Sequence, residues 1–340
     1  MGGNASGLFQ GLKKYMVKGL IALAIIILIL AVWFFYTLTR TDSSGLTGQP
    51  KKEVALGSSQ EGDDLDRVVT QAPIEGKRIV GLAFTDAVIG TMEHELDRTL
   101  GWRPNDIIFS LFTDNVENFQ LGVLEIVRRI MLAFNDKLAR FGSTYPLNPH
   151  LNKAFTGFNF RSTKFWFPSS ESVYRNAIKE LKIYRDGLGE ADRVKKGESA
   201  SNFFPRADNL HFLVGQIRQV LGSTQNLLTK QTEDDGSAIS WRKVDDYFYY
   251  AYGAMTATLT MFQAIKVDFE EEINAKSAMP LVDDIISSLA EPVRILRKSE
   301  PLIIIDRPIN SIFNNHRAHI NRPLADVRQK ISSFQATLLK

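Results

Sequence analysis

The sequence predicts an all-α protein in which one N-terminal transmembrane helix precedes a bundle or array of about seven helices. Three observations support this fold class. A run of twenty uncharged, mostly apolar residues lies near the N-terminus. Apolar residues then recur at three- and four-residue steps through most of the remaining chain. No alternation of strand and helix patterns indicates a parallel sheet.

The apolar run begins at Gly19, ends at Leu38 and carries aromatic residues at 33–36. At ~1.5 Å per residue it spans the ~30 Å hydrocarbon core of a bilayer. A cleavable signal peptide typically has an apolar region of ~7–15 residues that ends in small side chains. The longer run and its bulky end therefore predict an uncleaved transmembrane helix at residues 19–38, with the lipid bilayer as its partner.

Basic residues are distributed unequally around this span. Lys13, Lys14 and Lys18 precede it, and Arg40 is the first base after it. Because cytoplasmic flanks of transmembrane helices are enriched in Lys and Arg, residues 1–18 are expected in the cytoplasm. In a Gram-negative bacterium the chain is then a single-pass inner-membrane protein with a periplasmic C-terminal domain.

Composition excludes several function classes. The chain has no cysteine, which excludes disulfides, thiolate nucleophiles and cysteine-bound metal clusters. Beyond residue 40 there are 37 bases against 38 acids, since the first forty residues hold four bases and no acid. Residues 41–340 therefore have no excess of positive charge of the kind that attracts nucleic acid, so nucleic acid is not an expected partner.

A polar, Gly- and Ser-rich segment at 41–64 predicts a flexible linker, and the folded domain is expected over 65–340. Within that domain, apolar stripes at helical spacing predict the seven helices. They lie around 79–100, 116–138, 173–188, 210–228, 248–273, 282–296 and 324–338.

One segment departs from helical spacing, because residues 158–167 alternate between apolar and polar side chains and predict a small β-hairpin. Phe160, Phe165 and Trp166 belong to this aromatic segment and are candidate contacts for a ligand or partner. Two interpretations stay open. Either the rings fill one end of the bundle, with Trp166 mainly structural and neighbouring phenylalanines partly exposed, or they form a recognition patch.

Signatures of common catalytic sites are absent from the sequence: it contains no phosphate-binding glycine loop, no G-x-S-x-G elbow and no H-E-x-x-H pair. His316 and His319 have a spacing that suits a metal, but Arg317 between them opposes a cation. The sequence therefore predicts no metal site and no cofactor, and it favours a non-enzymatic role without deciding the question.

Several phrases together resemble an uncharacterised proteobacterial family of single-span membrane proteins, known only as a domain of unknown function. The phrases are G-W-R-P-N-D at 101–106, D-N at 114–115 with N-F-Q-L-G at 118–122, W-F-P-S-S-E-x-x-Y at 166–174, and R-A-D-N-L at 206–210. This resemblance covers about residues 65–340 and the anchor. It supports the topology and a Gram-negative source, and it implies no activity or catalytic residue.

The same phrases supply the remaining candidate contacts, which are Asn115, Gln120, Asp208 and Asn209. Carboxylates and carboxamides at helix starts and turns usually cap backbone N–H groups. The alternative is that some of them converge on a polar pocket that binds a ligand. We expect an envelope protein whose helical domain binds a protein or an envelope polymer, with a hydrolase acting on envelope glycan or lipid as the alternative.

Overall fold

The computed structural model describes residues 18, 21, 23–34, 40–41, 79–106, 110–142, 146–188, 201–299, 301, 304 and 316–340, without the side chains of 110–112. The chain divides into two compact units, Met1–Arg40 and Thr41–Lys340, which we describe separately. The predicted linker at 41–64 lies outside the described residues except for Thr41.

In the first unit, residues 23–34 are helical and their apolar side chains are largely exposed, as the 63% exposure of Leu28 illustrates. Residues 19, 20, 22 and 35–38 of the predicted span lie outside the described residues. Within the part of the chain that the structure describes, no helix is both long enough and apolar enough to cross a membrane.

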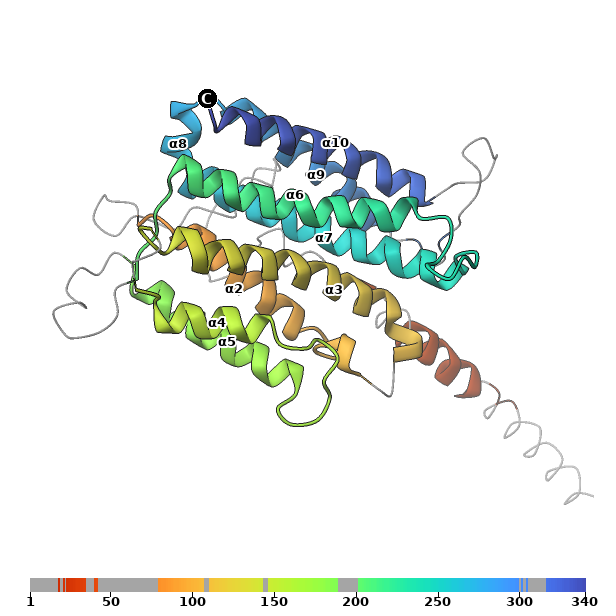
Figure 1. Ribbon diagram of the computed structural model, residues 1–340. Coiled ribbons are helices and arrows are strands. Elements are labelled where there is room, and N and C mark those ends of the chain that lie inside the picture. Colours follow the sequence, from red (N-terminus) through yellow and green to blue (C-terminus); the bar gives the residue numbers. More distant parts are fainter. Residues whose placement is uncertain are drawn as a thin grey trace, which may run out of the picture. The chain divides into compact units, whose positions relative to one another are not determined.

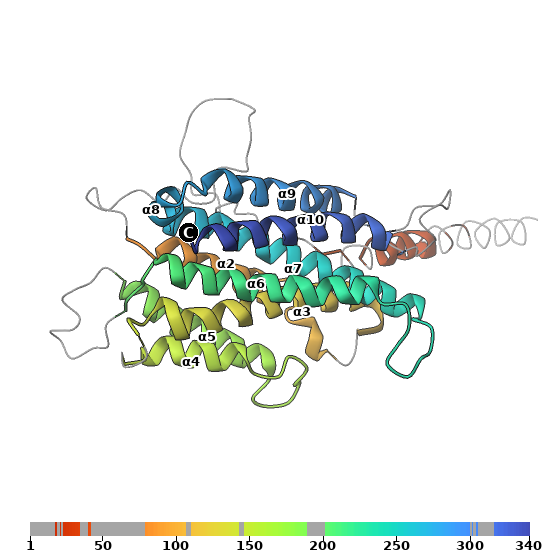
Figure 2. The same ribbon diagram turned by 45° about the horizontal axis from the view of Figure 1, so that its top comes forward.

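The second unit is a stack of antiparallel helix pairs (Figures 1 and 2). α9 and α10 form one outer layer, α6 and α7 lie next to them, α2 and α3 follow, and α4 and α5 form the other outer layer. The bounds of these helices are α2 Leu82–Leu96, α3 Ser110–Ala133, α4 Pro149–Phe158, α5 Ser170–Asp186, α6 Ala207–Thr229, α7 Trp241–Asp268, α9 Met279–Lys298 and α10 His316–Thr337.

The shorter elements are also helical: the 3-10 turn η4 at Arg103–Asn105, the π-helical turn η5 at Phe134–Leu138, and α8 at Glu270–Ala275. The all-α class is therefore confirmed for the described residues, which contain isolated β-bridges but no strand. The β-hairpin predicted near 158–167 is wrong. Phe158 ends α4, which the sequence analysis missed, and residues 159–169 form an irregular loop between α4 and α5.

α7 is the central helix, because α2, α3, α6, α9 and α10 all pack against it. Small side chains let its neighbours approach closely. An alanine Cβ placed at Gly253 would lie 2.0 Å from the carbonyl oxygen of Phe119, and one placed at Gly122 would lie 2.1 Å from that of Tyr250. α3 and α7 thus meet backbone to backbone, at a crossing that only glycine permits.

Several helix ends are completed by side chains from distant helices. Asp268 at the end of α7 accepts a 2.6 Å hydrogen bond from the backbone N–H of Phe84 in the first turn of α2. The buried Arg317 guanidinium donates to the carbonyl of Leu228 in the last turn of α6, at 2.7 Å. An acid at a helix start and a base at a helix end both satisfy orphan backbone groups and oppose the helix dipole. These contacts fix the lengthwise position of neighbouring helices.

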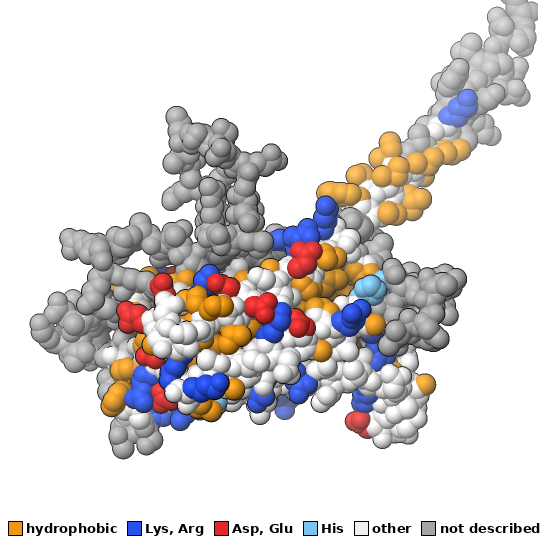
Figure 3. All heavy atoms as spheres, turned by 90° about the horizontal axis from the view of Figure 1, so that it is seen from above, with side chains coloured by type: hydrophobic (Ala, Val, Ile, Leu, Met, Phe, Trp, Pro, Cys, Tyr) orange, Lys and Arg blue, Asp and Glu red, His pale blue; other side chains and the backbone are white. Residues whose placement is uncertain are grey.

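The outer face that includes α9 and α10 carries acidic, basic and apolar side chains intermixed (Figure 3). Lys330 of α10, for example, pairs with Asp284 of α9 and with Asp326, each at 3.0 Å. Exposed pairs of this kind contribute about 0–1 kcal/mol each. This face therefore shows no patch of a single charge sign.

Candidate functional site

The loop that joins α4 to α5, residues 159–169, carries an exposed aromatic tip. Phe165 is 40% exposed, Trp166 73% and Phe167 92%. Phe160 is only partly exposed, and the Lys164 ammonium lies 5.4 Å from its ring centre. The loop therefore presents three large aromatic side chains to solvent at one end of the helix stack.

The expectation that Trp166 is mainly structural is wrong, whereas the partial exposure of its phenylalanine neighbours is confirmed. The physical reason is that other rings already fill this end of the stack. Trp102 and Tyr174 are buried and pack edge to face at 5.1 Å, and Tyr174 also contacts the buried Phe158. Phe165 and Trp166 instead pack edge to face on each other at 5.2 Å, outside the core.

Side chains from three helical regions hold the loop backbone. The indole N–H of Trp102 donates to the carbonyl of Ser162 at 2.8 Å. The hydroxyl of Tyr174 donates to the carbonyl of Phe160 at 2.9 Å. Arg128 of α3 donates to the same Phe160 carbonyl at 2.7 Å, so this oxygen has two partners.

Ser170, the first residue of α5, closes the loop at its other end. Its hydroxyl donates to the carbonyl of Arg161 at 2.6 Å and accepts a 2.9 Å bond from the backbone N–H of Lys164. The side-chain amide of Asn105 donates to the carbonyl of Lys164 at 3.3 Å. These bonds hold the backbone of residues 160–164 and the start of α5, which flank the exposed rings on both sides.

Gln120, one of the candidate contacts, is completely buried and holds the turn that precedes η4. Its amide N–H group donates to the carbonyls of Glu95 and Gly101, at 2.9 and 3.2 Å, and its oxygen accepts from the backbone N–H of Arg103 at 2.8 Å. Gly101 has φ +65°, a conformation that favours glycine. Gln120 thus fixes the turn that carries Trp102, and its role is structural.

Three of the four phrases singled out in the sequence therefore meet in one network. Gln120 holds the turn at 101–106, that turn supplies Trp102 and Asn105, and these residues bind the loop that continues into Ser170 and Tyr174. The sequence placed these phrases on separate helices and turns, and packing joins them. This network holds the loop that carries the aromatic tip, residues 165–167.

The other polar candidates do not converge with it. Asp208 pairs with Arg206 at 2.9 Å, and the Asn209 amide donates to the carbonyl of Phe204, so both organise the start of α6. Asn115 lies near the start of α3, at the opposite end of the stack from the start of α6 (Figure 1). Neither side chain caps a backbone N–H group at the start of α6, so the capping interpretation is wrong for Asp208 and Asn209, and the described residues show no common pocket for these candidates.

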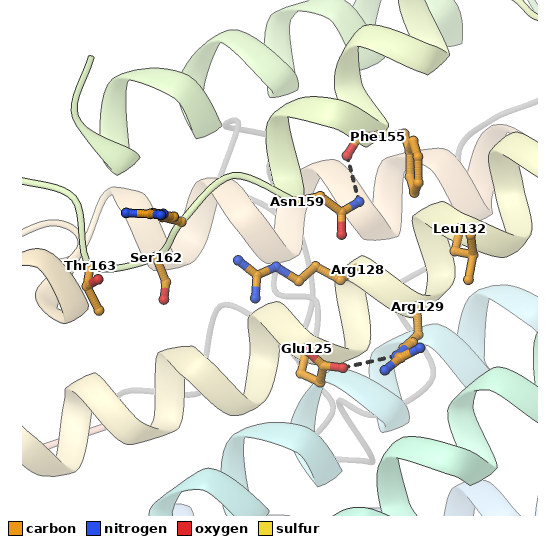
Figure 4. Close-up of a pocket in the computed structure, with 9 residues that line it drawn as sticks. Glu125, Arg128, Arg129, Leu132, Phe155, Asn159, Ser162 and Thr163 are labelled. Atoms are coloured by element: carbon orange, nitrogen blue, oxygen red, sulfur yellow. Dashed lines mark hydrogen bonds and ion pairs between the residues drawn. The ribbon is translucent and has the colours of Figure 1, made fainter. Parts of the chain in front are cut away.

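A groove of about 540 Å³ lies beside the loop (Figure 4). Its walls come from α3, from the end of α4 and from the first part of the loop. The lining residues are Glu125, Arg128, Arg129, Leu132, Phe155, Asn159, Arg161, Ser162 and Thr163. The sequence analysis missed the groove, although consecutive arginines on α3 and the bases interleaved in the aromatic segment were visible signals.

Two carboxyl groups on the facing helices, Glu117 of α3 and Asp246 of α7, have pKa values above the ordinary range. Burial, followed by the charges of Asp246 and Asp114, raises the pKa of Glu117 to about 6. Burial, followed by the charge of Asp114, raises the pKa of Asp246 to about 6 against the opposing hydrogen bond from Asn118. The fold therefore favours the protonated form of both groups.

This acidity predicts a pH-dependent stability. Since the folded-state pKa values lie above the ordinary 4.5 and 3.8, stability contributed by these groups is present below pH ~4 and is lost as the pH rises through about 6. The double variant Glu117→Gln, Asp246→Asn should be more stable than the parent by about 1 kcal/mol at pH 7, a figure reduced for partial solvent exposure, and equal to it near pH 4. Thermal unfolding between pH 4 and 8 measures this.

The exposed Glu271 provides a matched control, because Glu271→Gln removes a carboxylate outside this cluster and should leave the unfolding curves unchanged at every pH. A double variant that is less stable than the parent at pH 7 would contradict the assignment.

No group of three or more His, Asp or Glu side chains suited to a metal ion occurs among the residues that the structure describes. His316 packs on the ring of Phe248, and burial, then the charge of His319, lowers its pKa. The Arg317 between the histidines points to a backbone carbonyl of α6 and serves as a cap.

The fold and the site together define a class: an all-α stack of helix pairs that presents one braced aromatic loop beside an arginine-lined groove. The chain matches the profile of a family described as an uncharacterized protein conserved in bacteria (DUF2333), over residues 14–238 and 224–316. Because these matches cover most of the chain, the protein belongs to that family. Neither a curated protein nor a solved structure matches the chain.

Proposed function

We propose that this protein is a membrane-anchored binding protein of the bacterial cell envelope, and that its helical domain binds a protein or an envelope polymer through the α4–α5 loop. The observation that carries the proposal is the exposure of Trp166 and Phe167, 73% and 92%, between residues 160–164 and Ser170, two parts of the loop region held by side-chain hydrogen bonds. These exposed rings lie outside the buried core, so they should contribute little to the stability of the fold.

Such a loop is well suited to recognition. Trp is among the residue types that dominate binding energy at interfaces, because one side chain buries a large area with few rotatable bonds. Association also costs less when the contacting segment is ordered beforehand. The hydrogen bonds to Phe160, Arg161, Ser162 and Lys164 supply that order.

The proposed address follows from the sequence of the first unit. The apolar run at 19–38 would cross the inner membrane once, the lysines before it would keep residues 1–18 in the cytoplasm, and residues 65–340 would lie in the periplasm. The helical, apolar and exposed residues 23–34 suit such a segment. In this arrangement the α4–α5 loop meets envelope components.

One observation favours the alternative, a hydrolase that acts on envelope glycan or lipid. Glu117 and Asp246 both have a pKa near 6, the range of a carboxyl group that serves as a general acid. The hydrolase predicts that Glu117→Gln abolishes turnover, whereas the binding protein predicts that this variant still engages its partner through the loop.

The test is site-specific photo-crosslinking in living cells. A photoreactive amino acid in place of Phe167 should give a discrete adduct, and the same amino acid in place of the 67% exposed Trp241 should give none, since Trp241 is the first residue of α7 and lies outside the α4–α5 loop. Sensitivity of the adduct to glycan-cleaving enzymes, or its mass fingerprint, separates a polymer from a protein partner. Equal labelling at both positions would refute the proposed site, and an adduct with a cytoplasmic protein would refute the orientation.

A further inference from the structure

The groove beside the loop has an unbalanced charge. Arg128, Arg129 and Arg161 line it together with a single carboxylate, that of Glu125. Arg129 and Glu125 neutralise each other through a 3.0 Å ion pair (Figure 4). Two guanidinium groups are left over, so the groove carries a net charge of about +2 and attracts anions.

One of these two guanidinium groups is fixed in position by the fold. Arg128 donates from Nε to the carbonyl of Phe158 at 2.9 Å and from one terminal nitrogen to the carbonyl of Phe160 at 2.7 Å. The first carbonyl belongs to the last residue of α4 and the second to the α4–α5 loop, so Arg128 ties the helix end to the loop. The guanidinium also lies against the Tyr174 hydroxyl, and it lines the groove, where it adds a positive charge.

The second guanidinium group belongs to Arg161, at the start of the loop. Its side chain is exposed and makes no ion pair or hydrogen bond with the described residues. Ser162 and Thr163 follow it along the wall and add two hydroxyl groups, and Asn159 adds an amide. Residues 159–170 contain two bases and no acid, so no carboxylate of the loop competes for these donors.

We propose that this groove is a binding site for a phosphate group, carried by a phosphomonoester or phosphodiester. Planar guanidinium groups bind phosphate oxygens in pairs, and hydroxyl and amide donors complete the set. The groove is larger than a phosphate alone, and Leu132 and Phe155 give it an apolar wall for the uncharged remainder of the ligand. The site goes beyond the proposed function and does not involve the exposed rings of the tip.

Two sources could supply this chemistry: the headgroup of an anionic phospholipid, or a soluble phosphate compound. The test uses the full chain held in a non-ionic amphipathic polymer, which contains no phosphate. Inorganic phosphate and glycerophosphoglycerol, the diester headgroup of an anionic phospholipid without its acyl chains, are titrated by calorimetry and by broadening of the phosphorus NMR signal. Tighter binding of the diester indicates the lipid source, and tighter binding of inorganic phosphate indicates the soluble one; both support the site.

Arg161→Gln should weaken binding of the preferred probe about tenfold, and Arg161→Lys less than that, because lysine retains the charge but loses the paired donors. Arg242→Gln is the matched control: it removes an exposed guanidinium that lies over the ring of Trp241, outside the groove, and should leave the affinity unchanged. Melting curves of these variants should match the parent.

The inference is overturned if neither probe binds below about 10 mM, which corresponds to less than ~3 kcal/mol of binding free energy. It is overturned equally if Arg161→Gln binds as the parent does, or if Arg242→Gln loses as much affinity. Failure of this site is distinguishable from failure of the proposed function, because crosslinking at position 167 reports on the tip whether or not phosphate binds.

Discussion

Replacement of Gly253 by alanine is expected to destabilise the helical domain by about 3 kcal/mol or more, the upper range for overpacking a core. The new Cβ would lie 2.0 Å from the carbonyl oxygen of Phe119, an atom of the rigid α3 backbone that cannot rotate away. The backbones of α3 and α7 would have to move apart at this crossing. Thermal unfolding followed by circular dichroism measures the effect.

Gly90 is the matched control within α2, since a Cβ placed there meets nothing within 4 Å. Gly90→Ala should be neutral or stabilise the domain by up to about 1 kcal/mol, because alanine has the higher helix propensity. If the Gly253→Ala and Gly90→Ala variants had the same melting temperature, the close approach of α3 and α7 at Gly253 would be contradicted.

Trp102→Ala is the second substitution with a large expected effect, a loss of about 3–5 kcal/mol. Trp102 is 2% exposed, packs on Tyr174, and its indole N–H holds the carbonyl of Ser162. The variant removes a large buried ring and also releases the α4–α5 loop. Its unfolding curve should shift to lower temperature, and proteolysis should cut the loop sooner.

Trp166→Ala provides the internal contrast. The same chemical change at a 73% exposed ring should alter stability by no more than about 0.5 kcal/mol, while crosslinking from position 167 should decrease. A Trp166→Ala protein that melts as early as Trp102→Ala would show that the tip is part of the core and would remove the basis of the proposed function.

Much of the helix layout could be predicted from sequence because buried faces impose a period of 3.6 residues. All seven predicted helices are present, although the pattern at 248–273 is split into α7 and α8 around Phe269. α4 escaped detection for a local reason. Pro149 and Asn148 start it with good capping chemistry, but only Leu151, Ala154 and Phe158 of this short helix are buried, too few for a clear stripe.

The candidate site was predicted less well. Phe160, Phe165 and Trp166 were identified as a group, yet alternation along 158–167 suggested a hairpin with Trp166 in the core. The alternation arises instead from a helix end followed by a loop, and exposure depends on how much room the rings of Trp102 and Tyr174 leave. Gln120 was selected for its polarity, and its burial makes it a structural residue.

The sequence by itself determined the helical class, the approximate helix positions and the absence of cysteine chemistry, because each depends on residue type and on spacing over a few turns. Only the tertiary structure decided that Gly122 and Gly253 lie in one crossing, that Trp102 holds a loop sixty residues away, and that three arginines share a groove. These contacts join residues far apart in the chain. Which residues come into contact depends on side-chain volume and hydrogen-bond geometry where the helices pack. A local sequence pattern contains no information on either.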